Sequence, residues 1–128
     1  MVKVNVEPDC GNAPKKILLR DFMTAFANND VPSLLDRVAD DIQWELVGER
    51  SVTGKSDIEH AIRTLLHTSM KEMTIANILT HGDAGSVNGT MTFDDGKSYG
   101  FCNVCTFSSH SKSAKIKAIA SYFIEINT

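Results

Sequence analysis

A single carboxamide stands in the middle of an aromatic pattern in the last third of the chain. Residues 99–107 have the sequence Y-G-F-C-N-V-C-T-F, which is typical of a strand. Alternate side chains of a strand share a face. One face then carries Tyr99, Phe101, Asn103, Cys105 and Phe107. A buried amide without a partner costs about 1–3 kcal/mol, so we expect Asn103 to bind either a buried neighbour or a ligand.

The same segment contains a C-x-x-C pair, Cys102 and Cys105, a spacing that occurs in redox and zinc sites. Residues three apart on a strand point to opposite faces, so the two sulfurs would diverge. The third cysteine, Cys10, lies far away in the sequence. We therefore predict reduced cysteines that pack as small apolar residues.

The four histidines do not form a recognisable metal-binding pattern. His60 and His67 are seven residues apart on an expected helix, without a third ligand, and metal sites need three or four. His81 could be a general base only if it reached a pocket mouth, and His110 lies in a Ser-rich loop. Because no phosphate-binding or nucleophile motif is present either, we expect no cofactor and no metal.

Composition limits the possible partners. The 128 residues fit one domain, 1–128, in which residues 1–11 form a loose N-terminal arm or a short edge segment. The net charge of −3, without a basic block, argues against nucleic acid. No apolar stretch approaches the ~20 residues that span a bilayer, and the N-terminus lacks a signal-peptide pattern. We expect a cytoplasmic protein that binds neither nucleic acid nor membrane.

Three helices are expected before most of the strands. Asn12 could cap the first, Pro14 suits its first turn, and it should end near residues 28–30. Its apolar face would comprise Leu18, Phe22, Ala25 and Phe26, with Leu19 and Met23 beside it. A short second helix should follow Asp30, and Ser56 with Glu59 would form the capping box of a third.

The strands are expected to form one curved sheet. Residues 42–47 alternate as a half-buried strand, and residues 48–55 form a turn-rich connector. After Met70, four strand-like segments separated by turn signals predict an antiparallel meander. The fold class is α+β, a curved antiparallel sheet wrapped on three N-terminal helices. If the sheet curls around the first helix, it forms a cone whose mouth suits a small ligand.

Four stretches support a family resemblance: F-M-T-A-F-A-N-N-D, V-A-D-D-I-Q-W-E-L-V-G, T-G-K-S-D-I-E-H-A-I and A-S-Y-F-I-E-I-N. In their order and spacing, from Leu18 to Asn127, the chain resembles the nuclear-transport-factor-2-like superfamily, in its SnoaL-like and ketosteroid-isomerase-like branches. The resemblance implies a cystatin-like cone, often paired into homodimers through the sheet. Its members include isomerases, cyclases, hydrolases, dehydratases and binding modules, so the fold does not decide the function.

Comparison with the steroid isomerases implies a loss of catalytic groups. Those enzymes use an aspartate base, and a tyrosine with a protonated aspartic acid as an oxyanion hole. By resemblance, the tyrosine position is Phe22, the base position is Leu46 and the acid position is Asn103. Asparagine offers N–H donors at any pH, but neither phenylalanine nor leucine can replace its counterpart. Ketosteroid isomerase chemistry by that mechanism is therefore not expected.

The SnoaL-like cyclases use an acid in the pocket. Here the acids lie mostly in helix-surface or turn contexts, and Glu45 alternates away from Trp44 and Leu46. Asp21 neighbours Phe22 in sequence but lies about 100° around the helix from it. None of these acids is therefore expected inside the cone.

We therefore expect a protein that binds a small hydrophobic ligand in an aromatic pocket with one amide donor. The expected ligand-binding residues are Phe22, Phe26, Trp44, Leu46, Ile62, Tyr99, Phe101, Asn103, Ser121 and Phe123. Trp44 and the phenylalanines could equally be plain core residues. One alternative is an isomerase, cyclase or hydratase that uses Asn103, Tyr99 or a histidine. Another is a non-catalytic module that dimerises through outer sheet residues such as Tyr122 and Ile124.

Overall fold

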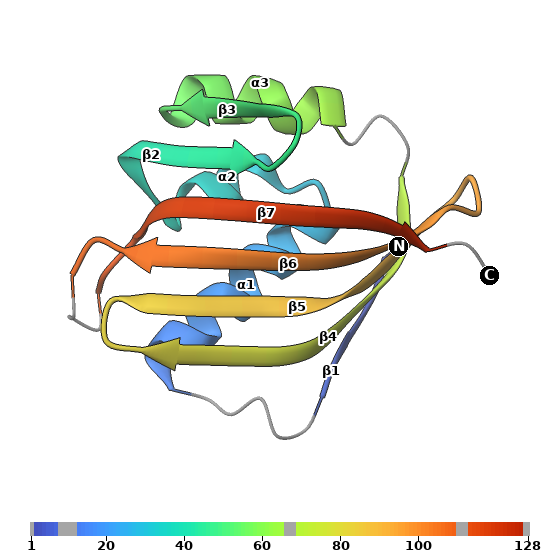
Figure 1. The fold of residues 1–128 in the computed structure, drawn as a ribbon, viewed down its shortest axis with the longest axis horizontal. Coiled ribbons are helices and arrows are strands. Elements are labelled where there is room, and N and C mark those ends of the chain that lie inside the picture. The colour runs from blue at the N-terminus through green and yellow to red at the C-terminus, as the bar shows by residue number, and fades with distance from the viewer. Residues whose placement is uncertain (1, 8–12, 66–68, 110–112, 127–128) are drawn as a thin grey trace.

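A computed structural model describes residues 2–7, 13–65, 69–109 and 113–126. The described elements are β1 (Lys3–Val6), α1 (Pro14–Ala27), α2 (Val31–Leu35), β2 (Val38–Leu46), β3 (Arg50–Thr53), α3 (Lys55–Leu65), β4 (Met70–His81), β5 (Ala84–Phe93), β6 (Ser98–Phe107) and β7 (Ile116–Ile126) (Figure 1). The predicted α+β class and the order of the three helices are confirmed. None of the described helices is long and apolar enough to cross a membrane.

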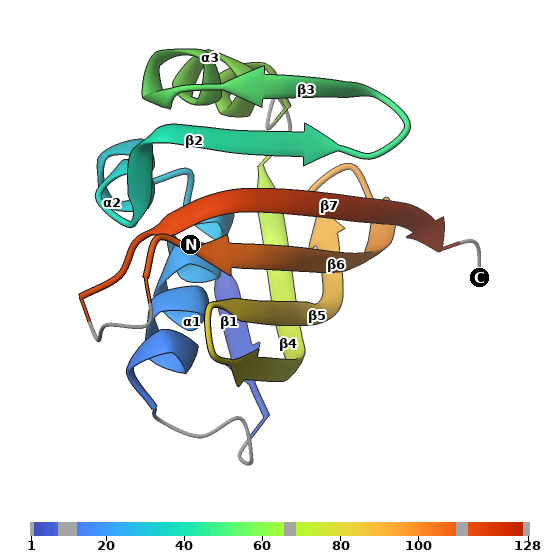
Figure 2. The ribbon, with the colours of Figure 1, turned by 60° about the vertical axis from the view of Figure 1, so that its left-hand side comes forward.

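The seven strands form one sheet in the order β1-β4-β5-β6-β7-β2-β3. Strands β4 to β7 are the predicted antiparallel meander. Two pairings are parallel, β1 with β4 and β2 with β7, and β3 pairs antiparallel with β2. The sheet is curved and unclosed, and α1 lies in its concave side (Figure 2).

A close approach between β4 and β5 accompanies the bend of the sheet. A Cβ atom at Gly89 would lie 1.9 Å from the carbonyl oxygen of Thr74. Beside it, the register of β4 shifts between Ile75 and Asn77. An extra residue of this kind bends a strand and increases its twist. The absence of a side chain at Gly89 therefore permits the curvature that wraps the sheet around α1.

The core lies between α1 and the concave face of the sheet. From α1 come Leu19, Phe22, Met23 and Phe26, all buried. From the sheet come buried residues of each central strand, such as Ile75, Val87, Phe101, Phe107 and Ile119. Burial of one large apolar side chain stabilises a fold by about 1.5–3 kcal/mol, so this layer holds the cone around the helix.

Several local predictions need correction. The N-cap of α1 is Ala13, without a side-chain hydrogen bond, and Asn12 lies outside the described residues. Helix α3 begins at Lys55, so Ser56 is inside its first turn and the predicted capping box is wrong. The carbonyl of Gly54 instead accepts a hydrogen bond from the Ile58 N–H.

Two short strands lie outside the predicted core of the sheet. Residues 50–53, predicted as part of a connector, form β3, because the chain turns back at Gly48, with φ of 88°, and pairs with β2. Residues Lys3–Val6 form the edge strand β1 beside β4, the second of the two alternatives for this segment. The Asn5 amide donates to the Glu72 carboxylate over 2.7 Å and helps to fix this edge.

Candidate functional site in the cone

Two polar side chains are buried on the concave face of the sheet. Asn103 on β6 is 2% exposed and Ser121 on β7 is 1% exposed, and they are the buried polar or charged side chains among the described residues. They face each other directly, because Asn103 pairs with Ser121 in the β6–β7 register. Both are surrounded by the apolar core, where an unpaired polar group is costly.

A chain of hydrogen bonds connects these residues to two further elements. The Trp44 indole N–H, from β2, donates to Ser121 Oγ over 2.7 Å. The Ser121 hydroxyl donates to Asn103 Oδ1 over 2.5 Å. The Asn103 Nδ2 donates to Met23 Sδ, on α1, over 3.1 Å. One continuous polar chain therefore crosses the interior from β2 to α1.

The direction of this chain follows from its first member. An indole N–H can only donate, so Ser121 Oγ must accept from Trp44. The Ser121 O–H is then left to donate, and the acceptor that it meets is Asn103 Oδ1. Asn103 therefore presents its oxygen to Ser121 and its NH2 group to α1. The only acceptor that the NH2 group meets among the described residues is a thioether, which is weak.

Aromatic rings line this polar chain on the α1 side. The Trp44 ring lies 5.7 Å from Phe22 and 6.3 Å from Phe26, centroid to centroid, both at 50°. Tilted pairs of this kind add about 0.5–1.5 kcal/mol beyond burial. Of the expected site residues, these three rings, Asn103 and Ser121 therefore come together around one point.

The other expected residues differ in burial and in their place along the sheet. Leu46 pairs with Ser121 across β2 and β7, and Ile62 of α3 is also buried. Phe101 pairs with Phe123, which is only partly buried. Tyr99, partly buried too, packs edge-on against Phe93 at 5.7 Å. Tyr99 is four residues from Asn103 along β6, about 13 Å, and so lies outside the hydrogen-bonded chain.

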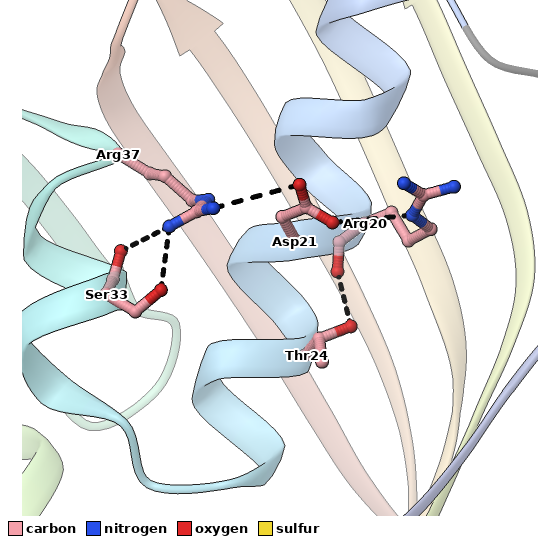
Figure 3. A network of polar contacts seen from close by, with 5 residues as sticks. All are labelled: Arg20, Asp21, Thr24, Ser33 and Arg37. Atoms are coloured by element: carbon pink, nitrogen blue, oxygen red, sulfur yellow. Dashed lines mark hydrogen bonds and ion pairs between the residues drawn. The ribbon is translucent and has the colours of Figure 1, made fainter.

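The carboxylates of the described residues lie outside the cone interior. Asp21, next to Phe22 in sequence, turns to the outer side of α1 (Figure 3). There its carboxylate lies 3.4 Å from Arg20 Nε and 3.7 Å from Arg37 Nη2. Arg37 also donates to the backbone oxygen and hydroxyl of Ser33, over 2.7 and 2.8 Å. Through Arg37, Ser33 of α2 is therefore connected to Asp21 of α1. Glu45 is exposed, as expected from its position on β2.

Histidines do not supply an interior base in the part of the chain that is described. His60 and His81 are exposed, and His67 and His110 lie outside the described residues. Within the described ranges, three His, Cys, Asp or Glu side chains do not gather closely enough to hold a metal ion.

The Cys105 thiol is protonated at neutral pH. Cys105 lies two residues from Asn103 on the same face, and burial, followed by the neighbouring Cys102, raises its pKa to about 12. Cys102 is only partly buried, on the opposite face, and both cysteines are free, as predicted. Among the residues that the structure describes, neither a thiolate nor a carboxylate therefore borders Asn103.

Met23 is the residue of this arrangement that the sequence prediction did not include. The periodicity of the first helix predicts Met23 beside the apolar face, whereas the structure buries it fully, with 1% of the residue exposed. The spacing Leu19, Met23 and Phe26, at i, i+4 and i+7, was the available signal. Leu18, which the same periodicity predicts on the apolar face, is only partly buried.

Comparison with known proteins identifies the family of this fold. The SnoaL-like domain matches residues 19–118. No curated protein matches the chain.

Similar solved structures have the same cone. They include an NTF-2-like protein of unknown function from Burkholderia xenovorans (TM-score 0.75, 15% identity, 90% of this chain and 86% of that one). A putative ketosteroid isomerase from Kribbella flavida is similar as well (TM-score 0.75, 14% identity, 90% of this chain and 81% of that one). So is a putative SnoaL-like polyketide cyclase from Shewanella denitrificans (TM-score 0.73, 8% identity, 88% of this chain and 91% of that one). At these identities the likeness establishes the fold alone.

Proposed function

Since the chain belongs to the SnoaL-like domain family, we propose that it uses the cone of this family to bind a small, uncharged, apolar molecule without acid–base catalysis. The observation that carries the proposal is the neutral polar chain from Trp44 to Met23, enclosed by aromatic and aliphatic side chains. Pockets for small ligands typically combine apolar walls with a few converging polar groups.

The position of the polar chain supports binding within the cone. It joins α1, β2, β6 and β7, the elements that enclose the concave side of the sheet. Each buried side-chain nitrogen and oxygen among the described residues has a partner. Of these contacts, the weakest is the one between Asn103 Nδ2 and the Met23 thioether, so it is the one that a ligand would displace at least cost.

The chemistry of the interior argues for binding rather than turnover. General acid–base catalysis needs a titratable group within hydrogen-bond reach of the substrate. The buried polar side chains of the described residues, Asn103 and Ser121, carry an amide and a hydroxyl. The nearby Cys105 thiol stays protonated at neutral pH because burial raises its pKa to about 12. Leu46, at the position that corresponds by resemblance to the catalytic base of the steroid isomerases, is a buried aliphatic side chain.

Thermal unfolding with and without a neutral bicyclic probe tests the proposal. α-Tetralone at tenfold excess over its Kd should stabilise the native protein by about 1.4 kcal/mol, visible as a higher unfolding midpoint by circular dichroism. The anionic control 2-naphthoate should leave the midpoint unchanged, because a charge is costly in this interior. Exchange of Leu79, which is 63% exposed on β4, for Ala should not alter the shift. Equal effects of the two probes, or no effect of α-tetralone at millimolar concentration, would contradict the proposal.

We also infer that the convex face of the sheet pairs with a second copy of the chain. Val104, Tyr122 and Ile124 are 48%, 45% and 71% exposed there. They lie on neighbouring strands, because Val104 pairs with Ala120 and Ile124 with Gly100. An exposed apolar patch suits a twofold dimer, in which the same patch of each copy meets its counterpart. Light scattering should give twice the chain mass, and Ile124→Lys should give one chain mass; a monomeric wild type would contradict the inference.

A further inference from the structure

We propose that Met23 occupies a position that a ligand oxygen takes on binding, and that Trp44 and Ser121 orient the Asn103 amide to receive it. The site therefore selects uncharged molecules that bear a hydrogen-bond acceptor, such as a ketone, ester or ether. This inference rests on the proposed function and specifies the chemical class of the ligand.

The first step concerns the unused donor capacity of Asn103. Its NH2 group carries two hydrogens, whereas its described acceptor is a single thioether sulfur at 3.1 Å. A carbonyl or ether oxygen accepts more strongly than a thioether. Exchanging Met23 Sδ for such an oxygen therefore improves the hydrogen bonding of a buried amide. A hydrocarbon of the same size would displace the sulfur without replacing the bond.

The second step concerns the orientation of the amide. If Asn103 could rotate freely, it could present its oxygen to a ligand donor equally well. Rotation would turn the NH2 group towards Ser121 Oγ, which can accept a second hydrogen bond, but the Ser121 O–H would then lose its acceptor, Asn103 Oδ1. Because a buried unpaired O–H is costly, the orientation in which Asn103 Oδ1 faces Ser121 is favoured. Trp44 and Ser121 are positioning residues. The amide N–H that faces Met23 can pair only with a ligand atom that accepts a hydrogen bond.

The third step concerns the mobility of Met23. Methionine is unbranched, has several rotatable bonds and adapts to irregular space. Its sulfur makes the one weak hydrogen bond in the polar chain, whereas the other links are strong O–H and N–H bonds to oxygen. Met23 is therefore the member of the chain that can move at least cost.

Nuclear magnetic resonance of the wild-type protein with two matched probes tests the displacement directly. α-Tetralone and tetralin differ by one carbonyl oxygen. α-Tetralone should bind about fivefold to tenfold more tightly, the effect of one hydrogen bond. It should also shift the Asn103 side-chain amide resonances and the Met23 methyl resonance together, whereas tetralin should shift the methyl alone. Equal affinities, or an Asn103 amide that does not respond to α-tetralone, would overturn the inference.

Variants test the positioning role through the ratio of the two affinities. Ser121→Ala should reduce the preference for α-tetralone about threefold or more, because the amide can then rotate, and Ser121→Thr should restore it by restoring the hydroxyl. Met23→Leu should increase the preference, since no sulfur competes. Met91→Leu, a buried methionine on β5 without a hydrogen bond to Asn103, is the matched control and should leave the ratio unchanged.

The outcomes separate the two proposals. Binding of both probes with equal affinity would overturn the selection for acceptors and leave binding in the cone intact. Binding of neither probe at millimolar concentration would overturn the proposed function and the inference with it. A preference that persists in Ser121→Ala would show that Ser121 does not position the amide.

Discussion

Asn103 and Ser121 are tolerated in the core because each satisfies the other. The net stabilisation from one hydrogen bond is about 1 kcal/mol, but an unsatisfied buried group costs about 1–3 kcal/mol. The Ser121 hydroxyl serves two partners, Trp44 Nε1 and Asn103 Oδ1. Loss of that hydroxyl would therefore leave a donor and an acceptor unpaired at once.

Ser121→Ala should accordingly lower the free energy of unfolding by about 1–3 kcal/mol, measured by urea denaturation. The matched control is Ser51→Ala on the exposed strand β3, which should change it by less than about 0.5 kcal/mol. If the two variants were equally stable, the hydrogen-bonded chain would not contribute to stability as described.

Because the pKa of the Cys105 thiol is raised, we expect the stability of the protein to depend on pH above 9.0. Its folded pKa, about 12, lies above its ordinary value of 9.0, because burial disfavours the thiolate. Above pH 9.0 the unfolded chain loses this proton and the folded chain keeps it. The stability that this group contributes is fully present below pH 9.0. As the pH rises from 9.0 towards 12, the free energy of unfolding therefore falls by about 1.4 kcal/mol per pH unit.

Urea denaturation of wild type and Cys105→Ala between pH 8 and 11 measures this effect, with the difference in slope assigned to the thiol. The variant should lose stability more slowly above pH 9.0. Parallel curves would contradict a buried, protonated thiol.

At the level of single residues, the sequence alone predicts the position of Asn103 but not its partners. The alternation in residues 99–107 places the amide on the inner face, and that face is confirmed. Its partner Met23 lies 80 residues away and Ser121 lies 18 away. Such contacts depend on how elements pack, and the local pattern carries no information about them.

Among the elements, β4 and β5 approach each other closely where the register of β4 shifts and the sheet bends. Gly89 is the residue at which a side chain would meet the backbone of the neighbouring strand. In the middle of a strand, glycine otherwise weakens packing and order. Its presence here is explained by the 1.9 Å separation that a Cβ atom would have from the Thr74 oxygen.

Gly89→Ala should therefore destabilise the protein by about 1–3 kcal/mol through overpacking, measured as a lower urea midpoint. Gly100→Ala on β6 is the matched control, since a Cβ there would come no closer than 4.0 Å to Ile124 O, an ordinary contact. If the two variants had the same midpoint, the curvature would not depend on this close approach.

The regular elements are predictable where their patterns are strong. The first helix and the four strands of the meander have clear periodicity, and the structure contains each of them. Strand β3 was missed because three of its four residues are exposed, so it has no apolar alternation. The parallel pairing of β2 with β7 joins segments more than 70 residues apart, and strand patterns alone do not encode partners.

For the molecule as a whole, the proposed site draws on elements from both ends of the chain. Met23 comes from the first helix and Ser121 from the last strand. A ligand that binds there contacts the folded cone only, because the unfolded chain does not bring these residues together. Binding should therefore stabilise the entire fold rather than one segment.

The cone and the convex face are two separate surfaces of this molecule. Trp44, the single tryptophan of the chain, lies on the concave side, and Tyr122 and Ile124 lie on the convex side. A bound molecule can therefore be located by which of these side chains it contacts.

Intermolecular nuclear Overhauser effects between bound α-tetralone and the protein make this distinction directly. Since the chain contains one indole, its signals belong to Trp44. Binding in the cone predicts contacts from α-tetralone to the Trp44 ring and the Met23 methyl group. Contacts to Tyr122 and Ile124 alone, or no contacts with any interior side chain, would contradict a ligand site in the cone.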